Sequence, residues 1–257
     1  MISENDLKAF LEEKHHKYNR EEFIESDPIQ IPKQFEDTKD IEIAGFLSAT
    51  IAWGQRRTII ANMNALLKRM HNTPYDFIIN AEDEDMEAFS DFKHRTFNGE
   101  DCIFFLKSLK NIYQNHGSLG DIFQHSYQKK GNIPEAIQTF RNIFFEIPHP
   151  GRTKKHVADI SKKSSAKRLN MFLRWMVRRD KQGIDFGIWD KIKMKDLFIP
   201  LDVHSGNVAR ELGLLKRKQN DWKAVEELTD KLREFDPEDP VKYDYALFGL
   251  GVFEKFA

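Results

Sequence analysis

The chain has 257 residues, with 40 Lys and Arg against 41 Asp and Glu, and a formal net charge of −1 at pH 7. A chain of this length can bury about three quarters of its unfolded surface, so it can build its own core of one or two lobes. Cys102 is the only cysteine, which excludes intrachain disulfides, zinc ribbons and an iron–sulfur cluster ligated by this chain's cysteines alone. The polar segment 1–6 is followed by no apolar run. We therefore expect a cytoplasmic protein that does not contact membranes.

The near-neutral total conceals a basic stretch. Residues 152–181 contain eleven Lys and Arg and only two Asp, a local charge of +9. Such a stretch is commonly a solvated face or a loop. The alternative is a polyanion contact, because clustered cations gain affinity by displacing the counterions of phosphates.

Apolar residues recur with helical spacing along most of the chain, and several helix starts can be identified. Thr73-Pro74 places proline at a first helical position, and residues 102–113 carry apolar side chains at steps of three and four. Ser118 before Asp121 and Asn132 before Glu135 indicate two further helix starts. Alternating strand-like runs are short. We therefore predict an all-α protein of roughly ten helices without an internal repeat, interrupted by irregular segments at 148–165 and 180–197.

The segment Trp53-Gly54-Gln55-Arg56-Arg57 lies where a helix is expected to break. It combines an aromatic ring, an amide and two cations, which could fill the gap left by a flipped base and hold its strand. The competing interpretation is a tryptophan packed at a turn between helices.

The helix that begins near Ala166 aligns Lys167, Asn170, Arg174 and Arg178 on one face. Its opposite face is apolar and we expect it to be buried. A lysine in the first turn of such a helix is ordinarily a solvated residue, but an amine beside a carboxylate can also act as a nucleophile.

Asp202 is that carboxylate. It is expected to cap the helix that follows it, where a carboxylate accepts amide hydrogen bonds and favours the positive helix end. His204 could join Asp202 as a metal ligand, but a catalytic metal normally has about three protein ligands, so we predict a structural role and no metal. Gly206 and Gly213 are expected to permit close helix packing and a helix end.

Several segments, which occur along the chain in the order expected for the family, resemble those of the helix-hairpin-helix DNA glycosylase superfamily, which includes endonuclease III and the archaeal-type 8-oxoguanine glycosylases. Residues 166–173 are similar to its Lys-x-x-Asn helix start, and 201–204 to its Val-Asp-Thr-His. Residues 209–214 are similar to its Arg-Leu-Gly-Leu run, 46–50 to its Leu-Leu-Ser-x-Gln segment, and 243–251 to its closing helix. The run from Lys167 to Arg178 also resembles a little-characterised bacterial branch, known mainly as a domain of unknown function.

The resemblance implies an all-α, bilobal helical bundle with a central cleft. Residues 1–257 would form one bilobal unit, with a central lobe at 45–175 that includes the hairpin. The second lobe would combine 1–44 with 176–257. The hairpin's glycine-flanked turn is replaced here by Lys162-Lys163-Ser164-Ser165-Ala166, so we expect an altered hairpin.

The resemblance further implies a base-excision glycosylase with associated AP lyase activity, which removes a damaged base, an oxidised purine among the candidates, through a lysine Schiff base. Lys167 would be the nucleophile and Asp202 its carboxylate partner. No cofactor is expected, and the partner would be double-stranded DNA with a damaged base, bound by a monomer associated with the nucleoid. The expected DNA-binding residues are Gln55, Arg56, Lys162, Lys163, Ser164, Ser165, Arg168, Asn170, Arg174 and His204. The expected base-stacking residues are Trp53, Trp175 and Trp189.

Two other interpretations stay open. The first is a catalytically inactive protein on the same scaffold that binds DNA or RNA structures. The second is an unrelated helical scaffold that binds protein partners.

Overall fold

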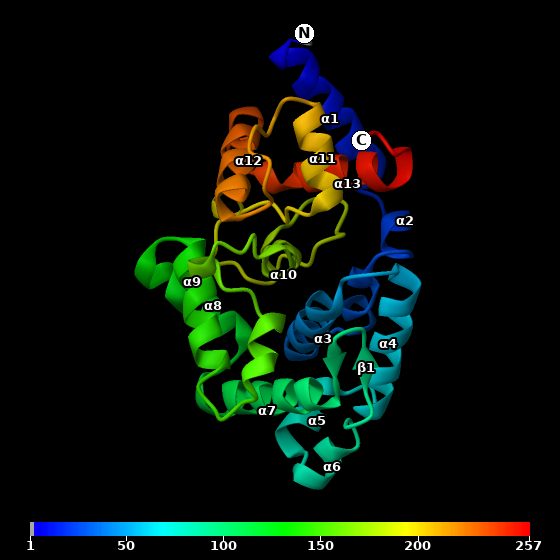
Figure 1. The fold of residues 1–257 in the computed structure, drawn as a ribbon, viewed down its shortest axis with the longest axis vertical. Coiled ribbons are helices and arrows are strands. Elements are labelled where there is room, and N and C mark those ends of the chain that lie inside the picture. Colours follow the sequence, from blue (N-terminus) through cyan, green and yellow to red (C-terminus); the bar gives the residue numbers. More distant parts are fainter. Residues whose placement is uncertain (1–2) are drawn as a thin grey trace. The chain divides into compact units, whose positions relative to one another are not determined.

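The computed structural model describes residues 3–257, and it is predominantly helical, as predicted (Figure 1). Thirteen α-helices lie in this part of the chain. The strands found there are β1 (Lys93–His94) and β2 (Phe97–Asn98), a minimal antiparallel pair in which Lys93 faces Asn98.

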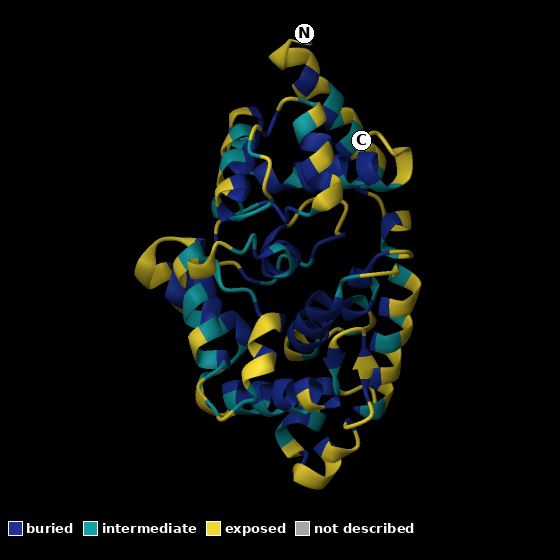
Figure 2. Cartoon of the chain, viewed as in Figure 1, coloured by how far each residue is buried: buried dark blue, intermediate teal, exposed yellow. Residues whose placement is uncertain are grey.

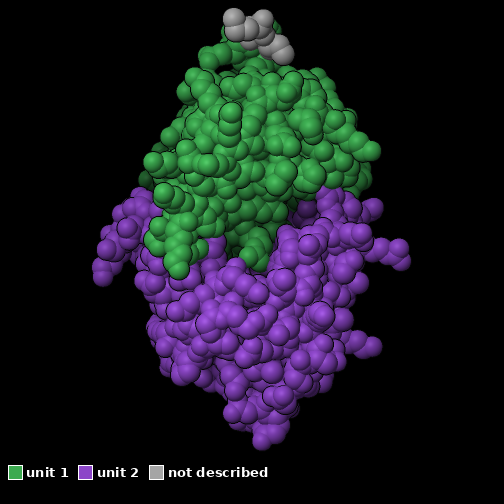
Figure 3. Space-filling view, in the orientation of Figure 1, with its two compact units in different colours: residues 1–24, 159–257 green, residues 25–158 purple. Residues whose placement is uncertain are grey.

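The described chain divides into two compact units (Figure 3). Unit 2 comprises residues 25–158, and unit 1 combines the N-terminal residues up to 24 with 159–257. The boundaries therefore lie about 20 residues before those expected at 45 and 175. As a consequence, the helix of Lys167 belongs to the unit that contains Asp202.

Unit 2 is built from seven α-helices and short 3-10 turns. In chain order these are η1 (Pro28–Gln30), η2 (Pro32–Gln34), α3 (Thr38–Ile51), α4 (Arg56–Arg69), α5 (Pro74–Asn80), α6 (Asp83–Glu87), α7 (Gly99–Asn115), α8 (Leu119–Lys130), α9 (Ile133–Phe144) and η3 (Gly151–His156).

The core of unit 2 surrounds α3, which is buried continuously from Ile41 to Ile51 (Figure 2). The Phe46 ring lies 5.3 Å from that of Phe140 and 5.4 Å from that of Phe144. Phe105 of α7 stacks on Phe46 at 5.8 Å. Such aromatic pairs add about 0.5–1.5 kcal/mol each to the effect of area burial. The predicted apolar stripe within residues 102–113 supplies this contact. Its six side chains at steps of three and four are all buried (Cys102, Phe105, Leu106, Leu109, Ile112 and Tyr113).

Unit 1 combines the N-terminal segment up to residue 24 with residues 159–257. Its elements are α1 (Glu4–Tyr18), α2 (Glu21–Ile24), η4 (Ile160–Lys162), α10 (Lys167–Val177), η5 (Met194–Asp196), α11 (Val203–Glu211), α12 (Trp222–Phe235), η6 (Pro240–Lys242), α13 (Tyr243–Gly249) and the π-helical turn η7 (Leu250–Glu254).

Helices α1 and α13, from opposite ends of the sequence, pack side by side (Figure 1). Gly249 makes this approach possible, because a Cβ atom at that position would lie 2.1 Å from Cδ2 of Tyr18. Gly251 likewise faces the first turn of α11, where its Cβ would lie 3.2 Å from the carbonyl oxygen of His204. The segment formed by α13 and η7 therefore packs closely against the start of α11.

The predicted helix starts are confirmed. Ser118 and Asn132 accept hydrogen bonds from the amides of Asp121 and Glu135, and Pro74 is the first residue of α5. Residues 180–197 contain no α-helix, and residues 148–165 contain only the 3-10 turns η3 and η4.

Candidate active site

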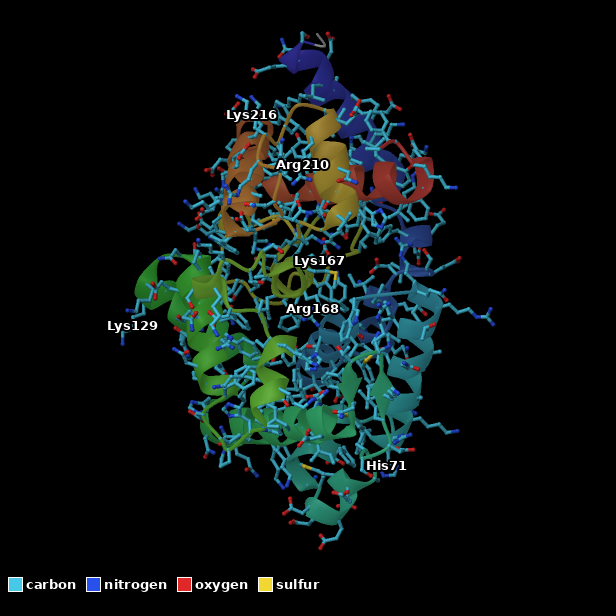
Figure 4. All side chains as sticks on the ribbon, in the orientation of Figure 1. His71, Lys129, Lys167, Arg168, Arg210 and Lys216 are labelled. Atoms are coloured by element: carbon cyan, nitrogen blue, oxygen red, sulfur yellow. The ribbon has the colours of Figure 1, made fainter. Side chains whose placement is uncertain are left out.

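Lys167 is the first residue of α10, and a turn with two left-handed residues delivers it there. Lys163 has φ 65° and Ala166 has φ 49°, the conformation for which glycine is favoured. The turn is fixed by hydrogen bonds: the amide of Ala166 donates to Ser164 Oγ at 3.3 Å, and Asn170 Nδ2 donates to the Ser165 carbonyl at 3.2 Å. The start of α10 is thus set by local contacts; Lys167 and Arg168 at this start are labelled in Figure 4.

Asp202 caps α11, as predicted from its position. Its Oδ1 accepts from the amide of Ser205 at 3.0 Å, and its own amide donates to Ser205 Oγ at 3.0 Å. Its carbonyl oxygen accepts from Asn220 Nδ2 at 2.9 Å. These contacts leave the second carboxylate oxygen, Oδ2, available to a partner from another element.

That partner is Lys167. Its Nζ lies 3.8 Å from Asp202 Oδ2, and the two side chains are 25% and 22% exposed. The separation is an ion-pair distance but is longer than a hydrogen bond, so the amine keeps its hydrogen-bonding capacity for another group. Two helix starts separated by 35 residues therefore place an amine and a carboxylate together at a partly exposed position of unit 1.

A buried ion-pair network lies on the same helix as Lys167. Arg174 donates through Nη1 to Asp244 Oδ2, and through Nε at 3.2 Å to Asp185 Oδ1. The Arg174 guanidinium also lies 4.4 Å from the ring centroid of Tyr245, whose hydroxyl donates to Asp185 at 3.0 Å.

Arg178, one turn further along α10, extends this network. It contacts Asp180 at 2.9 Å, Asp185 at 3.1 Å and Asp239 at 2.9 Å. Two arginines therefore meet four aspartates in a region where the arginine side chains are 5% and 1% exposed.

The acidic excess of the network reaches the Lys167–Asp202 pair through Asp244. Burial, followed by the negative charge of Asp202, raises the pKa of the Asp244 carboxyl to about 6, although Arg174 and Lys167 act to lower it. Burial also raises the pKa of Asp239, against the lowering effect of Arg178. Asp244 therefore changes charge close to neutral pH beside the amine and carboxylate of the candidate site.

Four residues expected to face DNA or a base are part of the core instead. Arg174 is 4% exposed and Asn170 1%, so neither presents its polar group to a ligand at the surface. Trp175 is fully buried, and Trp189 packs edge-on against Phe172 at 5.3 Å. The periodicity that aligned Arg174 with Lys167 is real, but that face of α10 is covered by aspartates from other segments.

The tryptophan of the 53–57 segment has a packed position in unit 2. The Trp53 ring stacks on His156 at 6.0 Å and meets His94 edge-on at 5.0 Å, and its carbonyl oxygen contacts His94 Nε2 at 3.0 Å. Gln55 is exposed at the start of α4, and Arg56 is half-buried. Trp53 is thus half-buried and in contact with two histidine rings, while Gln55 is exposed to solvent.

The remaining expected DNA-binding residues lie around the start of α10 and α11. Lys162, Lys163 and His204 are exposed, and Ser164 and Ser165 are half-buried. Arg168 is half-buried too, and burial lowers the pKa of its guanidinium to about 10. These residues belong to unit 1 together with Lys167 and Asp202.

Asp185, Asp239 and Asp244 were not identified from the sequence. Asp244 gave a weak signal, because it is a single carboxylate within the apolar run Tyr243–Gly251. Its arginine partner is 70 residues away along the chain.

Within residues 3–257, no group of three or more His, Cys, Asp or Glu side chains is arranged to hold a metal ion. The same residues form no helix that is both long and apolar enough to cross a bilayer.

A comparison with protein families places most of the chain in one of them. The family described as "Protein of unknown function (DUF2400)" matches residues 27–253, which is most of the chain. The chain therefore belongs to the DUF2400 family. Neither the curated proteins nor the solved structures contain a match to it.

Proposed function

We propose that this DUF2400 chain is a DNA glycosylase with associated AP lyase activity, built on the helix-hairpin-helix glycosylase scaffold with its cleft, in which Lys167 attacks the sugar of a damaged nucleotide. The observation that carries the proposal is the 3.8 Å approach of Lys167 Nζ to Asp202 Oδ2, at the starts of two helices. The amine is partly exposed and can reach a ligand. The carboxylate is oriented by Ser205 and cannot rotate away without losing its helix cap.

In the proposed reaction, the neutral amine of Lys167 forms a bond to C1′ of a flipped nucleotide while the bond from C1′ to the base breaks. The base leaves with a proton. The sugar ring then opens to give an imine between Lys167 and C1′, and loss of a C2′ proton expels the 3′ phosphate. Water finally hydrolyses the imine and restores the lysine.

Asp202 has two tasks in this scheme. Its Oδ2 accepts the proton that Lys167 must lose before attack. The same negative charge stabilises the positive charge that develops on the sugar as the base departs. The damaged base, in this proposal an oxidised purine, would be read by contacts other than this pair.

Borohydride trapping tests the proposal. A duplex with an abasic site or an oxidised purine is incubated with the protein and borohydride, and the covalent adduct is measured. We expect Lys167→Gln to abolish the adduct while duplex binding changes less than about threefold, because one surface charge contributes little to a many-phosphate interface. Asp202→Asn should slow adduct formation by about 10²–10⁴-fold, the range for a positioned proton acceptor.

The matched control is Lys8→Gln, which removes an exposed lysine of α1 that belongs to neither the candidate site nor the expected DNA-binding residues, and it should leave trapping intact. Adduct formation by Lys167→Gln at the wild-type level would reject Lys167 as the nucleophile.

A second candidate function is a protein that binds DNA or RNA structures without catalysis. The observation that favours it is the altered hairpin, in which η4 is a three-residue 3-10 turn and Lys163 and Ala166 occupy left-handed positions. Wild-type protein that binds duplexes yet forms no trapped adduct on any lesion would support this alternative.

A further inference from the structure

The loop between α11 and α12, residues 212–221, returns to the turn that precedes α10. Ser164 and Asp221 form an isolated antiparallel bridge, and the amide of Trp222 donates to the Lys163 carbonyl at 3.2 Å. Asn220 of the same loop donates to the carbonyl oxygen of Asp202. Two segments that are distant in sequence are therefore joined directly beside the candidate site.

Side chains hold this loop in one conformation. Arg217 donates to Asp221 through Nε at 2.6 Å, and its carbonyl oxygen accepts from Arg210 Nε at 2.8 Å (Arg210 is labelled in Figure 4). Asn220 packs against Gly206, where a Cβ would lie 2.8 Å from the Asn220 Oδ1. The loop is thus preordered, so a ligand that binds it need not supply the free energy to order it.

Four lysines stand on the joined segments. Lys162 and Lys163 belong to the turn before α10, Lys218 to the loop, and Lys223 to the first turn of α12, and all four are exposed. Across residues 3–257, none of the four side chains has a hydrogen-bond or ion-pair partner. Other lysines of unit 1 do have such partners: Lys14 and Lys17 pair with Glu254, and Lys231 pairs with Glu4.

In the described chain, the aspartates of these segments, Asp159 and Asp221, form no ion pair with the four lysines. Asp221 is paired with Arg217, and Asp159 accepts hydrogen bonds from the amide and hydroxyl of Ser161. The result is a positive area with unpaired ammonium groups next to Lys167 and Asp202. A repeating array of phosphates matches such an area, because each lysine can displace a condensed counterion.

We propose that Lys162, Lys163, Lys218 and Lys223, here called the lysine surface, bind the phosphate backbone of the duplex whose nucleotide reaches Lys167. The inference rests on the proposed function for the identity of the partner. It adds the loop and the start of α12 to the DNA interface, although both lie outside the basic stretch at 152–181. The lysine surface would position the duplex without reading its sequence.

The test replaces Lys218 and Lys223 with glutamate in the full-length protein. Binding to a duplex with a tetrahydrofuran abasic-site analogue is measured by fluorescence anisotropy at several salt concentrations. The slope of log K against log salt is negative, and each lost phosphate contact reduces its magnitude by about 0.9. For the two substitutions we therefore expect the magnitude to fall by about 2, and the affinity to fall at least about tenfold. The double variant Lys218→Gln, Lys223→Gln should also weaken binding, with a smaller loss of affinity. It serves as the test if the double glutamate variant does not fold.

The matched control is Lys8→Glu with Lys255→Glu, which changes the net charge equally at two other exposed lysines of unit 1. It should leave the slope within about 0.5 of wild type, since long-range effects of exposed charges are screened. An equal loss of slope in the control, or an unchanged slope in the Lys218 and Lys223 variants, would overturn the lysine surface.

Trapping by the wild type separates this inference from the proposed function. If the variants show the expected slope change but the wild type forms no adduct, the lysine surface is supported and the glycosylase proposal is rejected. If the wild type forms the adduct but the variants bind the duplex as the wild type does, the glycosylase proposal is supported and the lysine surface is rejected. Absence of duplex binding by the wild type at low salt would reject both.

Discussion

Replacing Arg178 with methionine should destabilise unit 1 severely, because this arginine is the cation that joins three aspartates. It is 1% exposed and reaches Asp180, Asp185 and Asp239 at 2.9–3.1 Å. Removing one partner of a buried ion pair costs about 3–5 kcal/mol, since the remaining charge is left without compensation. Asp185 keeps Arg174 and the Tyr245 hydroxyl. We therefore expect the lower end, about 3 kcal/mol at neutral pH.

The loss should also depend on pH in a defined direction. Burial raises the pKa of Asp239 and Arg178 lowers it, so without Arg178 this pKa rises further. A carboxyl whose folded-state pKa exceeds its unfolded value gives stability at low pH that is lost as the pH rises through the folded value. The penalty of Arg178→Met should therefore be smaller at about pH 5 than at about pH 7.5, because Asp239 can then be protonated.

Urea unfolding followed by circular dichroism at the two pH values measures both effects. Arg179→Met is the matched control: the neighbouring arginine is exposed, so its loss should change the free energy of unfolding by less than about 0.5 kcal/mol. A loss below about 1 kcal/mol for Arg178→Met, or an equal loss at both pH values, would refute the assignment of Arg178 as the hub of the network.

Further changes test the packing of α13 and the titration of Asp244. Gly249→Ala should separate α1 from α13, because the new Cβ would overlap the Tyr18 ring, and we expect a loss of about 1–3 kcal/mol in thermal unfolding. An unchanged melting temperature would contradict that close approach. Asp244→Asn should remove a pH dependence: the pKa of about 6 lies above that of an ordinary aspartate, so wild-type stability should fall by about 2 kcal/mol as the pH rises from about 4 to 7. Equal pH profiles for wild type and Asp244→Asn would show that Asp244 does not titrate in this range.

The buried network also changes how DNA binding should be tested. Arg178 belongs to the basic stretch at 152–181, together with the exposed Lys162 and Lys163. Arg178 is internal, so its reversal would report unfolding instead. The exposed lysines of the turn and the α11–α12 loop provide a cleaner comparison.

Local features of the fold could be predicted from the sequence. The caps at Ser118, Asn132 and Asp202 depend on side chains that bond to amides three residues away, so a short window contains the information. The buried stripe of α7 follows equally from spacing, because apolar residues at steps of three and four share one helix face. The position of Lys167 at the start of α10 belongs to the same class of local feature.

The assignment of charged residues to surface or core depended on the tertiary structure. Periodicity placed Arg174 on the polar face with Lys167, yet that face is buried because Asp185 and Asp244, 11 and 70 residues away, supply compensating charge. The approach of Lys167 to Asp202 and the return of the α11–α12 loop to Ser164 are also long-range. Helix propensity, capping and amphipathicity act over a few residues. The burial of a charge, in contrast, is decided by whichever distant side chains the folded chain brings against it.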